Sequence, residues 1–463
     1  MKRLILVSLL VHLVVKSEGI FQVFPDKDGV AAGNYYDDPL FLTPYIDRGE
    51  IEDGKQAAKV PLTDQNIVSY SGLLTVNRKF NSNIFFWYFP AEIENGTAPL
   101  VVWLQGGPGA SSLYGLFEEN GPFYVDANNQ LVKRDYYWTK NLNVLYIDNP
   151  VGTGFSFTNS PAGYSTNQVQ VGRNLYIAIR QFLYLFPELK DNELYITGES
   201  YAGKYVPAFA YTIDEHNELG DERINLKGIA IGDGMCDPAS MLNYGDYLYQ
   251  IGLIDMNTRR EMIKLQDITL NLINLEEYEL ATDTLRQIIL GMESHQKSIF
   301  ANKTGFSYYY NYMHYKYDNA HGDVDKFVNT DEMRSLLHVG NLTYNNGEKV
   351  SQHLKADMTK SIKPWFEKLL EKYRVVLYSG QLDIIIAYPL TLNFIRSLNW
   401  SGAEEYKTAE RKLWFVDNEL AGYTKTVGKF TEVLVRNAGH MVPSDQPKWA
   451  LDLIHRVTSN VPF

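Results

Sequence analysis

Short apolar runs separated by polar turns dominate the first part of the chain and predict β-strands. Residues 68–77 and 83–90 are rich in aromatic and β-branched residues on either side of a polar turn, which predicts a β-hairpin. Residues 100–104 (LVVWL) and 143–148 (NVLYID) are almost entirely apolar, as expected of central strands that are covered on both faces. The core is therefore expected to open with a hairpin and two buried strands.

A helical pattern follows the second buried strand. Apolar residues recur there at spacings of three and four residues, which predicts an amphipathic helix. These residues are Val171, Leu175, Ala178, Phe182 and Leu185. Ser165 and Gln168 have the spacing of a capping box, which predicts that the helix begins near Ser165. Pro187 has no backbone N–H and is expected to end the helix.

Strand and helix patterns then alternate. Further strands are predicted at residues 193–198, 224–233, 373–378, 411–416 and 430–436, with helices beginning near Ser200 and Pro447. This alternation predicts an α/β fold with a mostly parallel central sheet flanked by helices. Residues 236–364 contain helical segments without that rhythm and are predicted to form an insertion. Residues 19–235 and 365–463 then make up the core.

Composition and charge narrow the functional classes. The chain has 463 residues, of which 45% are hydrophobic, so it contains ample material for a large core. Its formal net charge is -12, and no run of clustered Lys and Arg is present. Binding to a phosphate backbone needs such clusters, so nucleic acid is excluded as an expected partner.

The N-terminus indicates secretion. Lys2 and Arg3 precede an apolar run from residue 4 to residue 15, which predicts a signal peptide over residues 1–18. That run is short for a membrane span, and no later stretch is long and apolar enough, so no span is expected. Four sequons are predicted glycosylation sites, at Asn95, Asn302, Asn341 and Asn399. The predicted location is the secretory pathway, ending in secretion or in an acidic lysosome- or yolk-like compartment.

A nucleophile elbow is indicated at Ser200. The segment GESYAG, residues 198–203, directly follows a predicted strand and leads into a predicted helix. Small residues at such a place let the chain turn sharply and expose the serine hydroxyl above the sheet. Ala202 stands where the strict G-x-S-x-G pattern has its second glycine. The alternative role for Ser200 is a helix N-cap.

A glycine-rich turn follows the strand at residues 100–104. It reads Gly106-Gly107-Pro108-Gly109. The N–H of Gly107, together with that of Tyr201 after the candidate nucleophile, is expected to form an oxyanion hole. The alternative is a plain turn. A phosphate-binding loop is excluded because no Lys-Ser/Thr pair follows.

Asp383 and His440 complete a candidate triad. Asp383 follows the predicted strand at residues 373–378, and His440 follows the strand at residues 430–436. The chain order of serine, aspartate and histidine matches α/β-hydrolases and differs from the orders in the other common triads. We therefore expect Ser200 as nucleophile, His440 as general base and Asp383 as the group that orients the histidine.

Five segments spread over the mature chain resemble the serine carboxypeptidase family. They are WLQGGPGASSLYGLFEENGP, DNPVGTGFSF, TGESYAGKYVP, GQLDIIIAYP and AGHMVPSDQP, in that order. The resemblance is strongest to the vitellogenic carboxypeptidase-like branch, in which Gln occupies the position of Gln105. It implies an α/β-hydrolase fold with a helical cap over the site, the triad given above, and Gly107 and Tyr201 as oxyanion donors. No cofactor and no metal are predicted.

The resemblance also implies how a free C-terminus is recognised. In the family, the residues that match Gln105, Glu119 and Glu199, with the backbone at Gly106, hold the substrate carboxylate. Met441 is expected to line the leaving-residue pocket. Clustered acids raise one another's pKa, so a shared proton and a preference for acid pH are expected. The predicted substrates are the C-termini of peptides or proteins.

Two positions depart from the common family pattern. Many members carry Asn at the position of Gln105, and many carry Cys at Ala110, which a disulfide ties to the insertion. This chain has a single cysteine, Cys236, so no intramolecular disulfide can form. Side-chain specificity is therefore the property least transferable from the family.

Three alternatives were weighed against a serine carboxypeptidase. A zinc carboxypeptidase is excluded because none of the nine His is followed three residues later by Glu. An acyltransferase shares the acyl-enzyme and stays open. A non-catalytic binding role also stays open, although the triad, oxyanion and carboxylate-binding positions favour an enzyme. The sequence indicates no oligomeric state.

Overall fold

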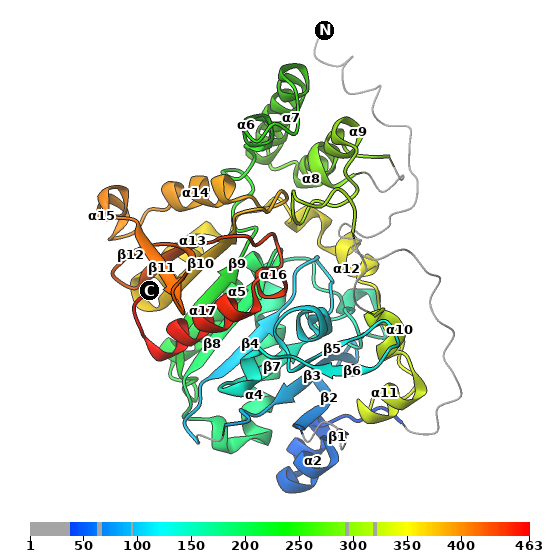
Figure 1. Ribbon diagram of the computed structural model, residues 1–463. Coiled ribbons are helices and arrows are strands. Elements are labelled where there is room, and N and C mark those ends of the chain that lie inside the picture. Colours follow the sequence, from blue (N-terminus) through cyan, green and yellow to red (C-terminus); the bar gives the residue numbers. More distant parts are fainter. Residues whose placement is uncertain (1–37, 63–66, 94–95, 292–295, 318–321) are drawn as a thin grey trace.

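A computed structural model describes residues 38–62, 67–93, 96–291, 296–317 and 322–463 (Figure 1). The predicted signal peptide and Asn95 lie outside the described residues. Within them, no helix combines the length and the apolar character that crossing a bilayer requires.

The core is built on one eleven-stranded sheet in the order β1-β2-β3-β7-β4-β8-β9-β10-β13-β12-β11. Its strands are β1 (Lys59–Leu62), β2 (Ile67–Asn77), β3 (Ser82–Phe89), β4 (Leu100–Leu104), β7 (Asn143–Ile147), β8 (Leu194–Glu199), β9 (Leu226–Gly232), β10 (Arg374–Gly380), β11 (Lys412–Val416), β12 (Glu419–Val427) and β13 (Phe430–Val435). The strands from β7 to β13 in this order are parallel, and those at both edges pair antiparallel. A separate small hairpin joins β5 (Phe123–Val125) to β6 (Leu131–Lys133).

The predicted hairpin and central strands are present. β2 and β3 pair antiparallel with Tyr70 opposite Tyr88, as the apolar pattern indicated. β4 and β7 are buried along their whole length, because each is covered on both faces. The other predicted strands appear with shifts of only a few residues at their ends. The strands β1, β5, β6 and β12 were not predicted.

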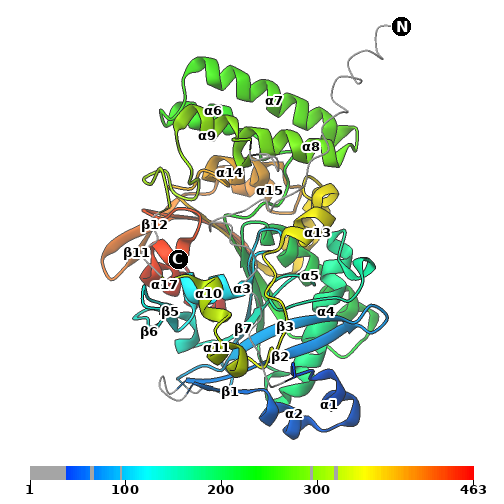
Figure 2. The same ribbon diagram turned by 90° about the vertical axis from the view of Figure 1, so that its right-hand side faces the viewer.

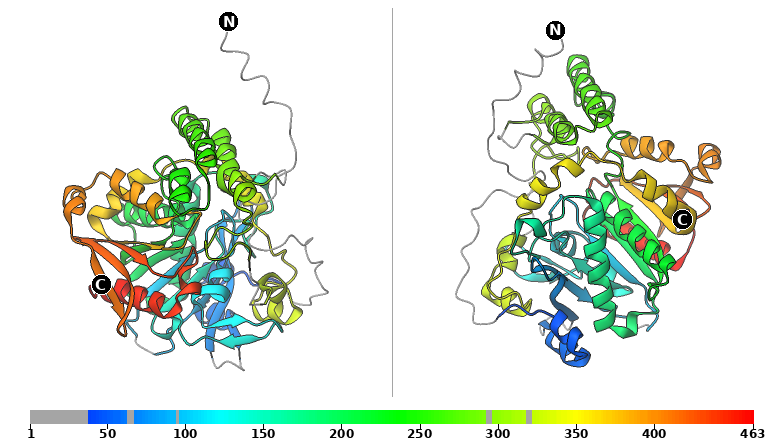
Figure 3. Two further views of the ribbon diagram at one scale, coloured as in Figure 1. Left: turned by 45° about the horizontal axis from the view of Figure 1, so that its top comes forward. Right: turned by 180° about the vertical axis from the view of Figure 1, so that it is seen from behind.

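Helices cover both faces of the sheet (Figures 1 and 3). They are α1 (Thr43–Arg48), α2 (Ile51–Ala57), α3 (Ser112–Tyr114), α4 (Gln168–Leu185), α5 (Ala202–Leu219), α6 (Tyr244–Gln250), α7 (Met256–Asn274), α8 (Tyr278–Leu285), α9 (Ile299–Thr304), α10 (Val324–Val328), α11 (Asp331–Leu336), α12 (Glu348–His353), α13 (Lys363–Lys372), α14 (Tyr388–Ser397), α15 (Ala403–Thr408), α16 (Val442–Asp445) and α17 (Pro447–Ser459). Successive strand side chains point to opposite faces, so the sheet separates two apolar cores. α4, α5, α13 and α14 pack into one core, and α17 packs into the other.

The capping box predicted for α4 is wrong. The helix begins at Gln168, and its N-cap is Asn167, whose side chain accepts a hydrogen bond from the Gln170 N–H. The Ser165 hydroxyl instead accepts from the Asn174 side chain. Asn is as good an N-cap as Ser, so two equivalent cap residues close together left the start ambiguous. The helix ends at Leu185, just before Pro187, as predicted.

Residues 236–364 contribute no strand to the large sheet within their described part. Their helices lie in two places. α6 to α9 project beyond the end of the sheet, whereas α10 and α11 lie lower, on the flank that carries β5 and β6 (Figures 1 and 2). α11 packs against the edge strand β1. This long segment therefore both overhangs one end of the sheet and runs down its side.

A buried polar cluster ties this segment to the core. Lys204, on the first turn of α5, lies 3.0 Å from the Asp357 carboxylate, and both side chains are buried. The Gln168 side chain donates to the same carboxylate at 2.7 Å, and the Tyr201 hydroxyl donates at 3.1 Å. Three core side chains thus converge on one aspartate of the segment.

Close backbone packing supplies a second tie beside Ala110. A Cβ on Gly109 would lie 2.7 Å from the Cα of Gly347, so the two backbones touch. Nearby, Gly154 and Asn345 exchange backbone hydrogen bonds of 3.1 and 2.8 Å. Both contacts join the core to the segment without a covalent link.

Candidate active site

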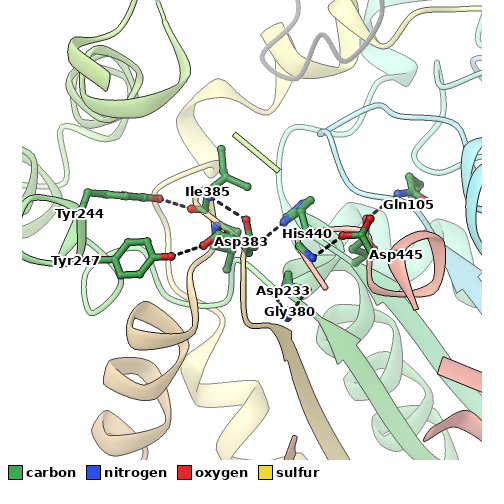
Figure 4. Close-up of polar contacts among 12 residues, drawn as sticks. Gln105, Asp233, Tyr244, Tyr247, Gly380, Asp383, Ile385, His440 and Asp445 are labelled. Atoms are coloured by element: carbon green, nitrogen blue, oxygen red, sulfur yellow. Dashed lines mark hydrogen bonds and ion pairs between the residues drawn. The ribbon is translucent and has the colours of Figure 1, made fainter. Parts of the chain in front are cut away.

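The parallel strands bring the candidate residues to one edge of the sheet. Gln105 follows β4, Ser200 follows β8, Asp383 follows β10 and His440 follows β13. The carboxyl ends of parallel strands meet at the same edge, which is where ligands bind in open α/β sheets. Residues that are far apart in the sequence therefore share one site (Figure 4).

Ser200 occupies a strained turn between β8 and α5. Its φ angle is +63°, a left-handed conformation that a residue other than glycine rarely adopts. Backbone hydrogen bonds fix the turn, since Ser200 N–H donates to Gly232 and its carbonyl accepts from Gly203 and Met235. α5 begins at Ala202 with Tyr201 at the N-cap position, so the alternative role of Ser200 as an N-cap is wrong.

The missing glycine of the elbow motif has a structural explanation. A Cβ on Gly203 would lie 2.7 Å from the Met235 nitrogen, and a Cβ on Gly198 would lie 2.5 Å from the Leu104 carbonyl oxygen. No side chain fits at these two positions. Neighbouring backbone therefore comes too close for a side chain at Gly198 and Gly203. The glycine that the motif lacks at Ala202 is present one residue later, at Gly203.

The glycine turn lies directly against the elbow. A Cβ on Gly106 would lie 2.6 Å from the Ser200 Cβ and 2.7 Å from the Tyr201 nitrogen. Gly107 has a φ of +108°, which favours glycine. The absence of a side chain therefore lets the backbone of Gly106 lie beside the Tyr201 nitrogen. Gly107, the other candidate oxyanion donor, is the next residue in this turn.

Asp383 and His440 form a buried pair. His440 Nδ1 lies 2.8 Å from Asp383 Oδ2, and the two side chains are 2% and 0% exposed (Figure 4). His440 Nε2 is also buried, and it has no hydrogen-bond partner among the described residues. With Nδ1–H held by the carboxylate, Nε2 is the basic nitrogen of this ring. The pair has the geometry of a histidine oriented for proton transfer.

The Asp383 carboxylate is fixed by its own loop. Ile385 N–H donates to Oδ1 at 2.9 Å, and Ile386 N–H donates to Oδ2 at 3.2 Å. The Asp383 carbonyl accepts from the Tyr247 hydroxyl, and the Ile385 carbonyl accepts from the Tyr244 hydroxyl, both at 2.8 Å. These tyrosines come from α6, so the segment 236–364 supports the loop directly.

Asp233 is a buried neighbour of the pair that the sequence patterns did not single out. It follows β9, accepts the Gly380 N–H at 3.0 and 3.2 Å, and is a close neighbour of the Asp383 side chain. Burial and the adjacent Asp383 charge raise the pKa of Asp233 well above its usual range. Asp233 is therefore the proton carrier of this carboxyl pair.

A tyrosine-rich strip, residues 308–312, lies across the histidine and the aspartate loops. Tyr310 stacks on the His440 ring, with centroids 4.8 Å apart, and its carbonyl accepts the His440 N–H at 2.6 Å. The Tyr309 carbonyl accepts the Ile385 N–H at 3.2 Å, and Tyr312 N–H donates to the Leu382 carbonyl at 2.9 Å. One strip thus binds the loops of both Asp383 and His440. The sequence patterns did not single it out.

Asp445 joins the same strip to the histidine loop from the other side. Its carboxylate accepts the Gly439 N–H at 2.6 Å and the Asn311 side chain at 3.0 Å (Figure 4). A Cβ on Gly439 would lie 2.1 Å from the Tyr310 carbonyl oxygen, so only glycine fits before His440. The AGH motif therefore reflects this contact with the strip.

Gln105 lies between the two candidate carboxylate-binding glutamates. Its Nε2 donates to Glu119 and to Glu199 at 3.1 Å each, and Trp103 Nε1 holds its oxygen at 2.8 Å. The tryptophan thereby orients the amide so that its N–H groups face the acids. Glu119 comes from a π-helical turn, Gly115–Asn120, and Glu199 is the last residue of β8.

Burial makes both glutamates weak acids. It raises the pKa of Glu119 to about 7, although Glu199, Gln105 and His440 act to lower it. Burial and the neighbouring Glu119 raise the pKa of Glu199 well above its usual range. Each acid also has one buried oxygen without a hydrogen-bond partner among the described residues. The cluster can therefore hold a proton at acid pH and offer it to an added carboxylate.

The pocket role of Met441 and the glycosylation of the described sequons stay predictions. Met441 follows His440, is half-buried and caps α16. Asn302, Asn341 and Asn399 are exposed, which leaves their side chains accessible to a modifying enzyme.

The chain is similar to known proteins over nearly its whole length. Residues 61–460 match the family model described as serine carboxypeptidase. The chain is 50% identical to a venom serine carboxypeptidase of Apis mellifera, with 100% of both chains covered. It is 48% identical to a vitellogenic carboxypeptidase of Aedes aegypti, over 91% of this chain and 90% of that one.

One solved structure is similar over most of its length. It is a prohormone-processing carboxypeptidase from Saccharomyces cerevisiae, 25% identical, with a TM-score of 0.76. The match covers 88% of this chain and 97% of the yeast chain. The predicted fold class is confirmed by this likeness together with the sheet described above.

Proposed function

Because the chain belongs to the serine carboxypeptidase family, we propose that it releases C-terminal amino acids from peptides through an acyl-enzyme on Ser200. The observation that carries the proposal is the buried Asp383–His440 pair, whose free nitrogen lies at the same sheet edge as the strained Ser200 turn. A buried charge-bearing pair and a strained serine are costly features that a purely structural site does not need.

The first half of the proposed reaction forms the acyl-enzyme. His440 Nε2 takes the proton from the Ser200 hydroxyl while Oγ attacks the carbonyl carbon of the last peptide bond. The N–H groups of Gly107 and Tyr201 stabilise the resulting oxyanion. His440 then gives its proton to the leaving amine, the C–N bond breaks, and the C-terminal amino acid departs. Asp383 stabilises the imidazolium throughout.

The second half regenerates the enzyme. A water molecule enters in place of the departed amino acid. His440 removes a proton from this water while the water oxygen attacks the acyl carbon. The proton returns to Ser200 Oγ as the ester bond breaks. The shortened peptide leaves with a new carboxylate, so one water is consumed for each residue released.

Restriction to the chain terminus follows from the glutamate cluster. The free carboxylate of the substrate is proposed to bind Gln105 and the backbone at Gly106, with a proton shared between it and Glu119 or Glu199. Two charged acids in a buried site would repel that carboxylate, whereas a protonated one donates a hydrogen bond to it. A preference for acid pH is part of this proposal.

The test is a comparison of the parent with Ser200→Ala. The variant should keep the fold and lose peptidase activity together with labelling by a fluorophosphonate probe, leaving only residual catalysis. A suitable control is Ser240→Ala, which alters a half-buried serine outside the site. Peptide release by Ser200→Ala at the parent rate rules out the assignment, and failure of the parent to react with the probe would favour a binding protein instead.

We further propose that residues 236–364 act as an insertion into a core made of residues 19–235 and 365–463, and that the chain is secreted and glycosylated. The exposed sequons at Asn302, Asn341 and Asn399 support the second part. Mass spectrometry of the native protein should find a mature N-terminus near Gly19 and glycan on some sequons. An intact Met1 with bare sequons would contradict secretion.

A further inference from the structure

A pocket of about 400 Å³, away from the candidate active site, lies between α14, α15 and the outer strands of the sheet. Figures 1 and 2 show these helices grouped with β11 and β12 at the side of the molecule. Cavities of this size hold small ligands in many proteins. None of its lining residues belongs to the candidate active site, so the pocket needs an explanation of its own.

Four cations line this pocket, which is unusual in a chain of net charge -12. They are Arg396, Lys407, Arg411 and Lys425. Lys407 is paired with Glu404 at 2.5 Å. Among the described residues, the other three have no acidic partner within ion-pair distance. The pocket therefore concentrates positive charge that the protein does not neutralise.

Aromatic rings, not carboxylates, hold two of these cations in place. The Arg411 guanidinium lies 3.9 Å from the centroid of the Tyr423 ring, and Lys425 Nζ lies 4.2 Å from that of Tyr406. A cation on a ring face is oriented without being neutralised, and its N–H donors stay free for another acceptor. Such cations are arranged in advance for an anion.

The one carboxylate in the pocket is already engaged. Glu432 is buried, and the hydroxyls of Tyr388 and Tyr406 both donate to it. Lys425 lies directly opposite Glu432 in the register of β12 and β13. Lys407 is neutralised by Glu404, so it does not count toward the net charge. The other three cations of the lining, Arg396, Arg411 and Lys425, are then opposed by the single carboxylate of Glu432. The pocket therefore keeps an excess of positive charge.

From this arrangement, we propose that the pocket binds a small phosphate or sulfate monoester. Guanidinium groups bind such tetrahedral anions through paired N–H donors, so Arg396 and Arg411 would hold the ester oxygens. Lys425 adds a point charge. The rest of the ligand packs against Leu392 and the Tyr388 ring, which supply the apolar part of the lining. The proposal does not depend on the proposed peptidase function.

Calorimetric titration with glucose 6-phosphate and glucose 6-sulfate, with glucose as the neutral probe, tests this site. At low ionic strength and pH 6, at least one ester should bind with a sub-millimolar Kd, and glucose should not. Arg396→Gln and Arg411→Gln should each weaken binding at least tenfold. Arg78→Gln removes a surface arginine paired with Asp47 and should leave the Kd unchanged. Fluorophosphonate labelling or circular dichroism confirms that each variant is folded.

Each result of these titrations either supports the anion site or overturns it. Binding of one ester alone identifies phosphate or sulfate as the source and supports the site. An affinity that falls as sodium chloride is added also supports it, because exposed charges are screened. No heat with either ester, or equal Kd values for the parent and both pocket variants, overturns the proposal.

Discussion

The carboxyl groups of Asp233 and Asp383 are close neighbours in the buried site, and burial together with the Asp383 charge raises the pKa of Asp233. Two adjacent buried carboxylates repel, so one of them must carry a proton. Burial and the adjacent Asp383 charge raise the pKa of Asp233 well above its usual range, so we assign the proton to Asp233. Both carboxyl oxygens of Asp233 accept the Gly380 N–H, whereas Asp383 accepts two backbone N–H groups and faces His440.

Replacing Asp233 with Asn should preserve activity, because an amide is likewise uncharged beside Asp383 and accepts from Gly380. We expect kcat/KM within about threefold of the parent for Asp233→Asn, and a loss of about ten- to hundredfold for Asp233→Ala, which leaves Gly380 N–H unpaired. Steady-state kinetics on one peptide measures both. Equal losses in the two variants would show that Asp233 works as a charged group.

The same pair gives a stability signature. Because the pKa of Asp233 is raised in the folded state, the folded protein binds more protons than the unfolded chain above pH 3.8. The stability that this raised pKa contributes is therefore complete below pH 3.8, and it is lost as the pH rises through the folded-state pKa of Asp233. Asp233→Asn removes this titration, so the melting temperature of the variant should decline less with rising pH than that of the parent.

The pH dependence of KM should reveal the glutamate cluster. As pH rises through about 7, the pKa of Glu119, the cluster loses the proton that a substrate carboxylate needs. KM for a peptide with a free C-terminus should then rise by up to about tenfold per pH unit. The matched peptide amide lacks the carboxylate, so its KM should stay flat.

Two variants test whether the glutamates cause this pH dependence of KM. Glu119→Gln and Glu199→Gln each keep a neutral, hydrogen-bonding side chain and should flatten the curve for the free acid. Identical KM profiles for acid and amide in the parent would remove the physical basis of the proposed terminal specificity.

Tyr310 is expected to position His440. Its ring lies on the imidazole, so Tyr310→Ala should lower kcat by about ten- to hundredfold with a smaller change in KM, since small displacements of a catalytic group are costly. Tyr310→Phe keeps the ring and should remain within about twofold of the parent. Tyr315→Ala, at an exposed tyrosine nearby, is the control. An unchanged kcat in Tyr310→Ala would show that the stacking has no catalytic role.

The buried Lys204–Asp357 pair should matter for stability. Lys204→Met leaves the buried aspartate without its cation and should cost about 3–5 kcal/mol in the free energy of unfolding. Adding Asp357→Asn removes the stranded charge while still accepting from Gln168 and Tyr201, so the double variant should recover part of that loss. Lys368→Met, at an exposed lysine on α13, should change little. Urea unfolding of all four proteins gives the values.

The pattern of apolar runs was sufficient for the core because its central strands are buried on both faces. β4 is apolar throughout and β7 is apolar after Asn143, so their assignment depended on no long-range information. β12 was missed for the opposite reason. Its few buried residues are mixed with half-buried and exposed ones without a regular period, and its middle contains Gly422 and Lys425, so the segment resembles a loop in composition. Pairing with β11 and β13 makes it a strand.

For the candidate site, residues inside recognisable motifs could be identified from the sequence, and residues that act through tertiary contact could not. Ser200 and His440 each follow a strand in a distinctive local context. Asp233 also follows a strand, and that position was the available signal for it. Tyr310 carried no comparable signal, because its contact with His440 depends on how residues 308–312 cross the sheet edge.

The strip at residues 308–312 has a consequence for protein engineering. It hydrogen-bonds to the loops of both Asp383 and His440, so it supports two members of the proposed triad although it belongs to residues 236–364. A chimera that exchanges the whole of residues 236–364 for those of a relative would also exchange the contacts that align the triad. Grafts made to alter substrate preference should therefore exchange α6 to α9 only in part, keeping Tyr244, Tyr247 and the strip with their own core.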